Sequence, residues 1–122
     1  MKIFILRDNA EVRNINIKFN EIEAYRIIDN NLSNAIKYSK KESKIFIKLE
    51  KLETGFVLEF KDEGIGIKDV SRLFERYYRG DKITGGFGIG LSIVKNICDK
   101  NGIKIDVFSK ENDGSIFRYI FS

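Results

Sequence analysis

The chain has 122 residues, of which 43% are hydrophobic and 33% are charged, and its formal net charge is +4. This length suits one domain with a hydrophobic core, residues 1–122, and is too short for two. Histidine is absent, which excludes a Ser-His-Asp triad and any histidine-ligated metal. The single Cys98 excludes an intrachain disulfide, and its apolar neighbours predict a buried side chain.

The first half of the chain predicts a strand or hairpin followed by a long helix. Apolar residues alternate with polar ones over 1–19, as in a strand. Asn20 is placed to cap a helix over 21–38. The helical spacing of its apolar residues predicts that one face is buried, formed by Ile22, Tyr25, Ile28, Leu32, Ala35 and Ile36.

The remaining elements alternate between paired strands and helices. We expect strands at 44–50 and 55–62, a short helix at 70–74, a mobile loop at 76–86, a helix at 89–100, and strands at 103–109 and 115–121. This order favours an α+β fold of two layers, in which helices cover one face of a mixed, largely antiparallel sheet.

Two glycine clusters are the strongest indication of a ligand. Asp62-Glu63-Gly64-Ile65-Gly66 ends one predicted strand, and Gly85-Gly86-Phe87-Gly88-Ile89-Gly90 precedes the second long helix. Glycine lets the backbone approach a ligand closely, and a helix N-terminus favours an anion such as phosphate. The scattered Lys and Arg residues lie among nearly as many carboxylates, so we do not expect nucleic-acid binding.

Polar residues in three other places could act on the same ligand. Asn30, Asn34 and Lys37 recur along one side of the first helix and offer oxygen ligands for a hard cation beside a phosphate-binding amine. Asp62 could accept a hydrogen bond from an exocyclic amine. Arg79 belongs to an aromatic run before the predicted loop, and its guanidinium suits phosphate oxygens. A solvated helix face, a simple Asp-Gly turn and a packed helix end remain the alternatives.

Taken together, these segments resemble the catalytic domain of two-component sensor histidine kinases. The resemblance covers roughly residues 20–121, and four motifs occur in the family's order and spacing. The Asn box corresponds to 30–39, the first glycine box to 62–67, the Phe box to 73–79 and the second glycine box to 86–91.

The resemblance implies a Bergerat, or GHKL-type, fold that binds ATP and Mg²⁺. Asn34 would coordinate Mg²⁺ with support from Asn30, and Tyr38 would cover the adenine ring. Asp62 would accept from the adenine amine in a pocket shaped by Gly64 and Gly66. The phosphates would be contacted by Lys37, Arg79, Gly86, Gly88, Gly90 and Leu91.

The chain departs from the family pattern at two motif positions and in its composition. Glu63 stands where Asn is common and could face solvent, and Phe87 replaces a frequent Thr. The family's phosphoacceptor histidine lies on a helical dimerisation domain, which this histidine-free chain lacks. The expected partners are therefore that domain and a downstream response regulator. We expect the isolated domain to be a monomer in the cytoplasm, and anchoring of the parent protein in the inner membrane is left open.

Three rival functions remain at the level of sequence. An ATP-hydrolysing clamp of the same superfamily would carry a Glu as general base where this chain has Asn30. A Ser/Thr kinase of the anti-sigma type would need no separate acceptor domain. A degenerate domain would bind partners without catalysis, which the intact Asn34 and Asp62 argue against.

Overall fold

The computed structural model describes residues 2–7, 19–39, 42–67, 73–74 and 90–122. The elements in chain order are β1 (Lys2–Arg7), α1 (Glu21–Tyr38), β2 (Lys44–Leu52), β3 (Gly55–Asp62), α2 (Gly90–Asn101), β4 (Lys104–Lys110) and β5 (Gly114–Phe121). Within the described residues, neither helix is long and apolar enough to cross a bilayer. The helices predicted at 21–38 and 89–100 and the strands predicted at 44–50, 55–62, 103–109 and 115–121 are confirmed to within two residues at each end. Of the strand or hairpin predicted over 1–19, the structure describes the strand β1.

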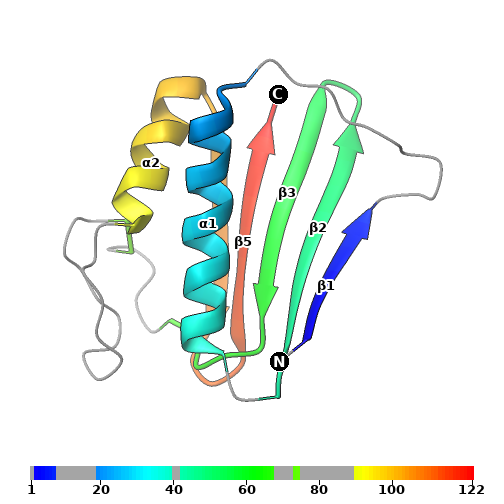
Figure 1. Ribbon diagram of the computed structural model, residues 1–122, viewed down its shortest axis with the longest axis vertical. Coiled ribbons are helices and arrows are strands. Elements are labelled where there is room, and N and C mark those ends of the chain that lie inside the picture. The colour runs from blue at the N-terminus through cyan, green and yellow to red at the C-terminus, as the bar shows by residue number, and fades with distance from the viewer. Residues whose placement is uncertain (1, 8–18, 40–41, 68–72, 75–89) are drawn as a thin grey trace.

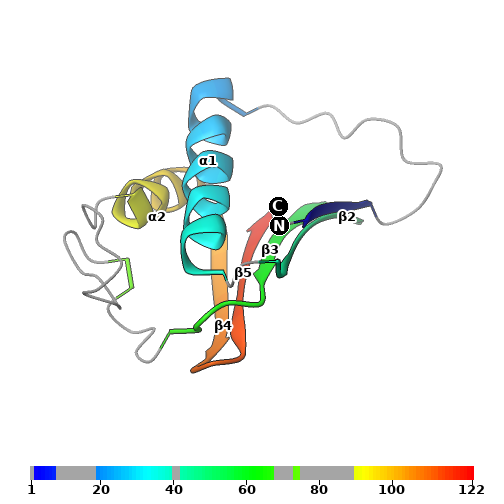
Figure 2. The ribbon, with the colours of Figure 1, turned by 60° about the horizontal axis from the view of Figure 1, so that its bottom comes forward.

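The strands form one five-stranded sheet in the order β1-β2-β3-β5-β4 (Figure 1). The pairs β2–β3, β3–β5 and β4–β5 are antiparallel, whereas β1 lies parallel to β2 at one edge. Figure 2 shows α1 and α2 together on one face of this sheet. The predicted α+β fold of two layers, with a mixed and largely antiparallel sheet, is therefore confirmed.

The core lies between the two helices and the inner face of β3, β5 and β4. Its buried members come from both helices and all three strands or their ends: Ile27, Phe60, Val94, Ile97, Cys98, Ile103, Phe117 and Tyr119. Burying such side chains contributes roughly 1.5–3 kcal/mol each before entropy is counted. The predicted burial of Cys98 is confirmed, and desolvation raises the pKa of its thiol to about 11.

The predicted buried face of α1 is wrong at Ile22, Tyr25, Ile28 and Ile36 and confirmed at Ala35, and the helix bounds and the Asn20 cap are confirmed. Ile22 and Tyr25 are 64% and 65% exposed, and Ile28 and Ile36 are exposed as well. The helix buries Ala35 together with Ile27 and Asn31, which were not predicted, and the three lie one turn apart on a single row.

Asn31 explains why the buried row was missed. Its amide nitrogen donates to the Ile27 carbonyl oxygen at 2.8 Å, and its Oδ1 atom accepts from the Tyr119 hydroxyl at 2.7 Å. A buried polar side chain is tolerated when its hydrogen bonds are made. Apolar periodicity alone cannot detect a core position that is filled by asparagine.

Candidate functional site

The C-terminal half of α1 lies next to two segments that are distant from it in sequence. The residues that follow β3 lie at the C-terminal end of this helix, and the first turn of α2 lies beside its middle (Figure 1). The isolated bridge between Ser39 and Gly64 and the hydrogen bond from the Ile65 N–H to the Tyr38 carbonyl oxygen, 3.2 Å long, join the end of α1 to the residues that follow β3. The Asn box and first glycine box are therefore neighbours in space.

Asp62 ends β3 as a carboxylate that is only 8% exposed. Its Oδ1 atom accepts a hydrogen bond from the Gly64 N–H at 2.9 Å. Burial raises the pKa of this carboxyl, while hydrogen bonds from the backbone of Gly64 and Ser115 oppose that rise. Since a carboxylate can accept several hydrogen bonds, Asp62 can also accept one from a ligand.

Gly64 allows the loop after β3 to pass close to the end of α1. A Cβ atom at this position would lie 2.3 Å from the Tyr38 carbonyl oxygen. Cβ atoms in proteins do not approach other atoms this closely, so a larger residue would force the two segments apart. The Ser39 hydroxyl oxygen, beside this loop, is buried without a hydrogen-bond partner in the described structure. The glycine thus holds the loop against the end of α1, and the Ser39 hydroxyl is a buried polar group left without a partner beside it.

Asn30 contacts the first residue of α2. Its amide nitrogen donates to the Arg26 carbonyl oxygen at 2.7 Å, which fixes the orientation of the side chain. A Cβ atom at Gly90 would lie 2.4 Å from the Asn30 Oδ1 atom. The amide oxygen therefore faces the N-terminus of α2, where backbone N–H groups and the helix dipole favour an anion.

Asn34 and Lys37 lie further along the same side of α1. Asn34 is half-buried one turn after Asn30, and this polar row runs beside the buried row of the helix. From the sequence we expect this polar row opposite the apolar face of the helix, and that expectation is wrong because the buried row of Ile27, Asn31 and Ala35 lies directly beside it. Lys37 is exposed, with its Nζ atom 5.5 Å from the centre of the Tyr38 ring.

The remaining predicted site residues divide into two groups. Gly66 adopts a left-handed φ of 73°, and Leu91 in the first turn of α2 is half-buried against the core. Arg79, Gly86 and Gly88 lie outside the described residues, as do the predicted loop at 76–86 and most of the short helix at 70–74.

Glu63, which replaces the common Asn, has an exposed side chain, as anticipated. Its Oε1 atom accepts a hydrogen bond from the Lys44 N–H at 3.0 Å. The substitution therefore adds a link to the start of β2 while leaving the Asp62 carboxylate in place.

The side chains present fit a nucleotide with its metal better than a metal alone. Within the described ranges, no group of three or more His, Cys, Asp or Glu residues could hold an ion. Asn30 and Asn34 offer neutral amide oxygens, and Mg²⁺ usually completes such a shell with phosphate oxygens and waters. The first turn of α2, next to Asn30, is where such phosphates would lie.

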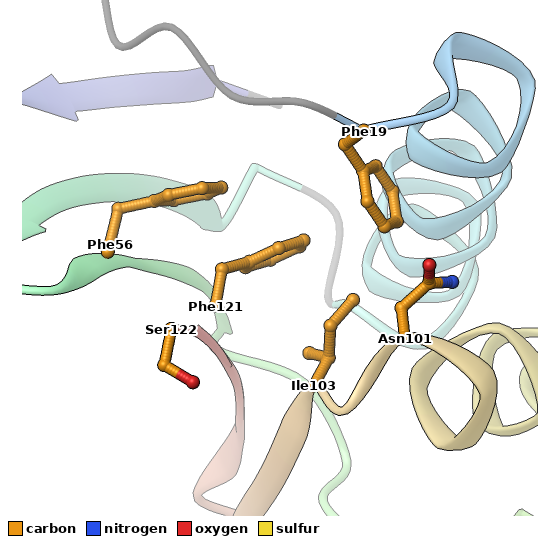
Figure 3. Close-up of a pocket in the computed structure, with 7 residues that line it drawn as sticks. Phe19, Phe56, Asn101, Ile103, Phe121 and Ser122 are labelled. Carbon is orange, nitrogen blue, oxygen red and sulfur yellow. The ribbon is translucent and has the colours of Figure 1, made fainter.

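A pocket lies at the end of β3 opposite to Asp62 (Figure 3). This pocket of about 320 Å³ is lined by Phe19, Gly55, Phe56, Asn101, Ile103, Phe121 and Ser122. The Phe56 and Phe121 rings stack at 4.3 Å between centroids, and Phe19 meets Phe121 edge-on at 5.5 Å. None of the predicted site residues lines it.

Comparisons with known proteins agree on one family. Residues 19–122 match the family of histidine kinase-, DNA gyrase B- and HSP90-like ATPases. The sensor-like histidine kinase SenX3 of Mycobacterium tuberculosis is 34% identical over 126 residues, covering 93% of this chain and 31% of that protein. The histidine-protein kinase ArlS of Staphylococcus aureus is 36% identical over 115 residues, covering 89% and 26%.

A solved structure agrees with these relatives. The catalytic domain of histidine kinase ThkA superposes with a TM-score of 0.81 at 25% identity, covering 98% of this chain and 78% of that one. The chain spans less than a third of the length of the two curated relatives.

Proposed function

We propose that this chain delivers the γ-phosphoryl group of ATP to a histidine on a separate helical domain. The proposal starts from its family: the chain belongs to the histidine kinase-, DNA gyrase B- and HSP90-like ATPases, and it is the ATP-binding catalytic domain of a sensor histidine kinase. The observation that carries this proposal is the buried Asp62 carboxylate, held by the Gly64 N–H beside the end of α1. Such an acceptor suits the exocyclic amine of adenine.

Each predicted residue has a role in this proposal. Asp62 accepts from the adenine amine, Gly64 and Gly66 shape the pocket by letting the loop pack closely on neighbouring backbone, and Tyr38 covers the base. Bound Mg²⁺, held by Asn34 with Asn30 beside it, would neutralise charge on the phosphate oxygens. The phosphates would be held by Lys37, Arg79, Gly86, Gly88, Gly90 and Leu91, the last two at the start of α2.

The chemistry asked of this chain is mainly positioning and charge neutralisation, as is usual for phosphoryl transfer. The full-length protein would supply the helical dimerisation domain with its histidine, and a response regulator would take the phosphoryl group onward. The domain itself would work in the cytoplasm as a monomer, whether or not the parent protein is anchored in a membrane.

An ATP-hydrolysing clamp is the second candidate, and Asn30 argues against it. A clamp needs a general base near the attacking water, which typically accelerates the reaction ~10²–10⁴-fold. The Asn30 amide donates to the Arg26 carbonyl oxygen and cannot take a proton. The site thus supports holding ATP intact rather than hydrolysing it.

The proposal is tested first by nucleotide binding. Leaving the adenine amine without its acceptor costs roughly 1–3 kcal/mol, so Asp62→Ala should weaken ATP binding about tenfold or more in calorimetry. Asp99→Ala, at an exposed position on α2, is the matched control and should bind as the wild type does. Unchanged affinity in Asp62→Ala would contradict the assignment of the base pocket.

The kinase step is tested with γ-labelled ATP and a helical histidine domain supplied in trans. We expect label on the added domain and none on this chain, which has no histidine. Acid-stable label on this chain would indicate a Ser/Thr kinase, and brisk phosphate release would indicate a clamp.

A further inference from the structure

The loop that carries Asp62 rests against a hairpin that comes about fifty residues later in the chain. We call residues 62–67 the base loop and residues 109–115 the β4–β5 turn. The Ile67 N–H donates to the Ser109 Oγ atom at 2.7 Å, and the Asn112 N–H donates to the Ile65 carbonyl oxygen at 2.7 Å. The two segments are therefore joined by hydrogen bonds in both directions.

Glycines make the contact close on both sides. Gly66 has a φ of 73°, and a Cβ atom there would lie 2.1 Å from the Lys110 carbonyl oxygen. Gly114 has a φ of 92°, and a Cβ atom there would lie 2.1 Å from the Asp62 carbonyl oxygen. Backbone therefore packs directly on backbone, and the position of the base loop depends on that of the β4–β5 turn.

The Ser109 hydroxyl lies at the centre of this contact. It accepts a hydrogen bond from the Ile67 N–H and donates one to the Gly114 carbonyl oxygen at 3.1 Å. Its oxygen also lies 2.9 Å from the Ser115 hydroxyl oxygen. The backbone of Ser115 in turn hydrogen-bonds the Asp62 carboxyl. One half-buried hydroxyl thus connects the last residue of the base loop with the strand that holds Asp62 in place.

From this geometry we propose that Ser109 is a positioning residue for adenine recognition, acting through Ile67 and the base loop. The inference rests on the proposed nucleotide site and adds the element that holds it in shape. Without the hydroxyl, the Ile67 N–H loses its acceptor and the end of the base loop is free to shift away from the β4–β5 turn. Preorganised contacts of this kind reduce the ordering cost of binding.

The test compares Ser109→Ala with Ser109→Thr in the 122-residue chain. Losing one half-buried hydrogen bond predicts roughly five- to tenfold weaker ADP binding in Ser109→Ala. Ser109→Thr keeps the hydroxyl on a strand, where threonine is well tolerated, and should bind within about twofold of wild type. Thr54→Ala removes an exposed hydroxyl from the turn at the far end of β3 and serves as the matched control.

A second readout separates positioning from general stability. In the nucleotide-free protein, hydrogen exchange of the Ile67 amide should accelerate in Ser109→Ala and stay slow in Ser109→Thr, while amides in the middle of β5 remain protected. Discrimination between ADP and GDP should fall together with affinity. A uniform loss of protection, or loss of binding in Ser109→Thr as well, would overturn the inference.

A backbone variant tests the same contact without the hydroxyl. Asn112 adopts a left-handed φ of 69°, which directs its N–H toward Ile65. Asn112→Gly tolerates this conformation and should bind ADP normally, whereas the β-branched Asn112→Val does not and should bind more weakly.

The outcomes also separate the two proposals. Wild-type affinity in Ser109→Ala and in Asn112→Val, alongside weak binding in Asp62→Ala, would overturn the role of Ser109 and leave the nucleotide site standing. If the wild-type chain bound no adenine nucleotide, both proposals would fall.

Discussion

The two ends of the sheet are built by different means. At the end where Asp62 lies, backbone packs on backbone through Gly64, Gly66 and Gly114, and hydrogen bonds fix the geometry. At the other end Gly55 also lies close to the Phe121 backbone, but the side-chain contacts are between rings: Phe56 stacks on Phe121, and Phe19 meets Phe121 edge-on (Figure 3).

The difference teaches which property each end controls. Aromatic rings contribute mainly through the apolar area they bury, and this contribution is non-directional. Hydrogen bonds contribute little net stability but impose geometry. Changes at the aromatic end should therefore lower the free energy of unfolding without altering nucleotide affinity. Of the four predictions below, those at Phe121 and Asn20 test this division directly, and those at Tyr119 and Arg118 measure what hydrogen bonds between the two ends contribute to stability.

The largest effect is expected from Phe121→Ala. Truncating a core phenylalanine typically costs 3–5 kcal/mol, and because Phe121 is only partly buried we expect about 3 kcal/mol in urea unfolding. Phe121→Leu should recover much of this loss. ADP affinity of the folded variants should stay at the wild-type value, and a marked fall in affinity would show that the two ends are coupled.

Tyr119→Phe should have the next largest effect. The Tyr119 hydroxyl is buried, burial raises the pKa of its phenol far above the usual value, and it donates to the Asn31 Oδ1 atom at 2.7 Å. Removing it leaves that oxygen unpaired, at a cost of about 1–3 kcal/mol. Adding Asn31→Leu removes the unpaired group, so the double variant should be more stable in urea than Tyr119→Phe alone. Equal stabilities would contradict this account of the pair.

Asn20→Ala should cost about 1 kcal/mol of stability. The Asn20 Oδ1 atom accepts from the N–H groups of Ile22 and Glu23 at 2.9 and 3.0 Å, which caps α1 near the aromatic end. Thermal unfolding measures the loss, and Asn20→Ser, which keeps a capping oxygen, should show little of it. Calorimetry should again find unchanged ADP affinity.

The smallest effect is expected from Arg118→Met on β5. Arg118 donates through Nε and Nη2 to the Glu59 Oε1 atom at 3.0 and 2.8 Å, across the β3–β5 pair. Because the Arg118 side chain is 38% exposed, solvent screens the pair, and we expect a loss below about 1 kcal/mol. Urea unfolding of the two single variants and the Glu59→Gln, Arg118→Met double variant isolates the pair energy. A coupling well above that value would contradict the screening argument.

Much of the fold followed from local pattern. Alternating apolar residues indicate the strands β2 to β5, and Asn20 indicates the start of α1. These elements were therefore predicted close to their observed bounds. The parallel pairing of β1 with β2 was not predicted. How two strands separated by a long helix pair depends on tertiary packing, which no local pattern records. The buried face of α1 was missed because its central position is Asn31.

The candidate site was predicted in part. Asn30, Asp62, Gly64 and Gly90 are motif residues, and the structure brings Asn30 to Gly90 and the Asp62 loop to the end of α1. The support from Ser109 could not be predicted, because a lone serine in a strand carries no signal. Its partner Ile67 contributes only a backbone N–H, which every residue but proline possesses.

The close packing of Gly66 on Lys110 and of Gly114 on Asp62 has a consequence for protein engineering. Chimeras between relatives are often joined in the loops between elements. A crossover anywhere from α2 to β4 would take the base loop from one parent and the β4–β5 turn from the other. The backbones of these two segments would then come from different proteins and would still have to pack in direct contact. Crossovers placed before Asp62 or after Ser115 keep both segments from one parent and should preserve nucleotide binding.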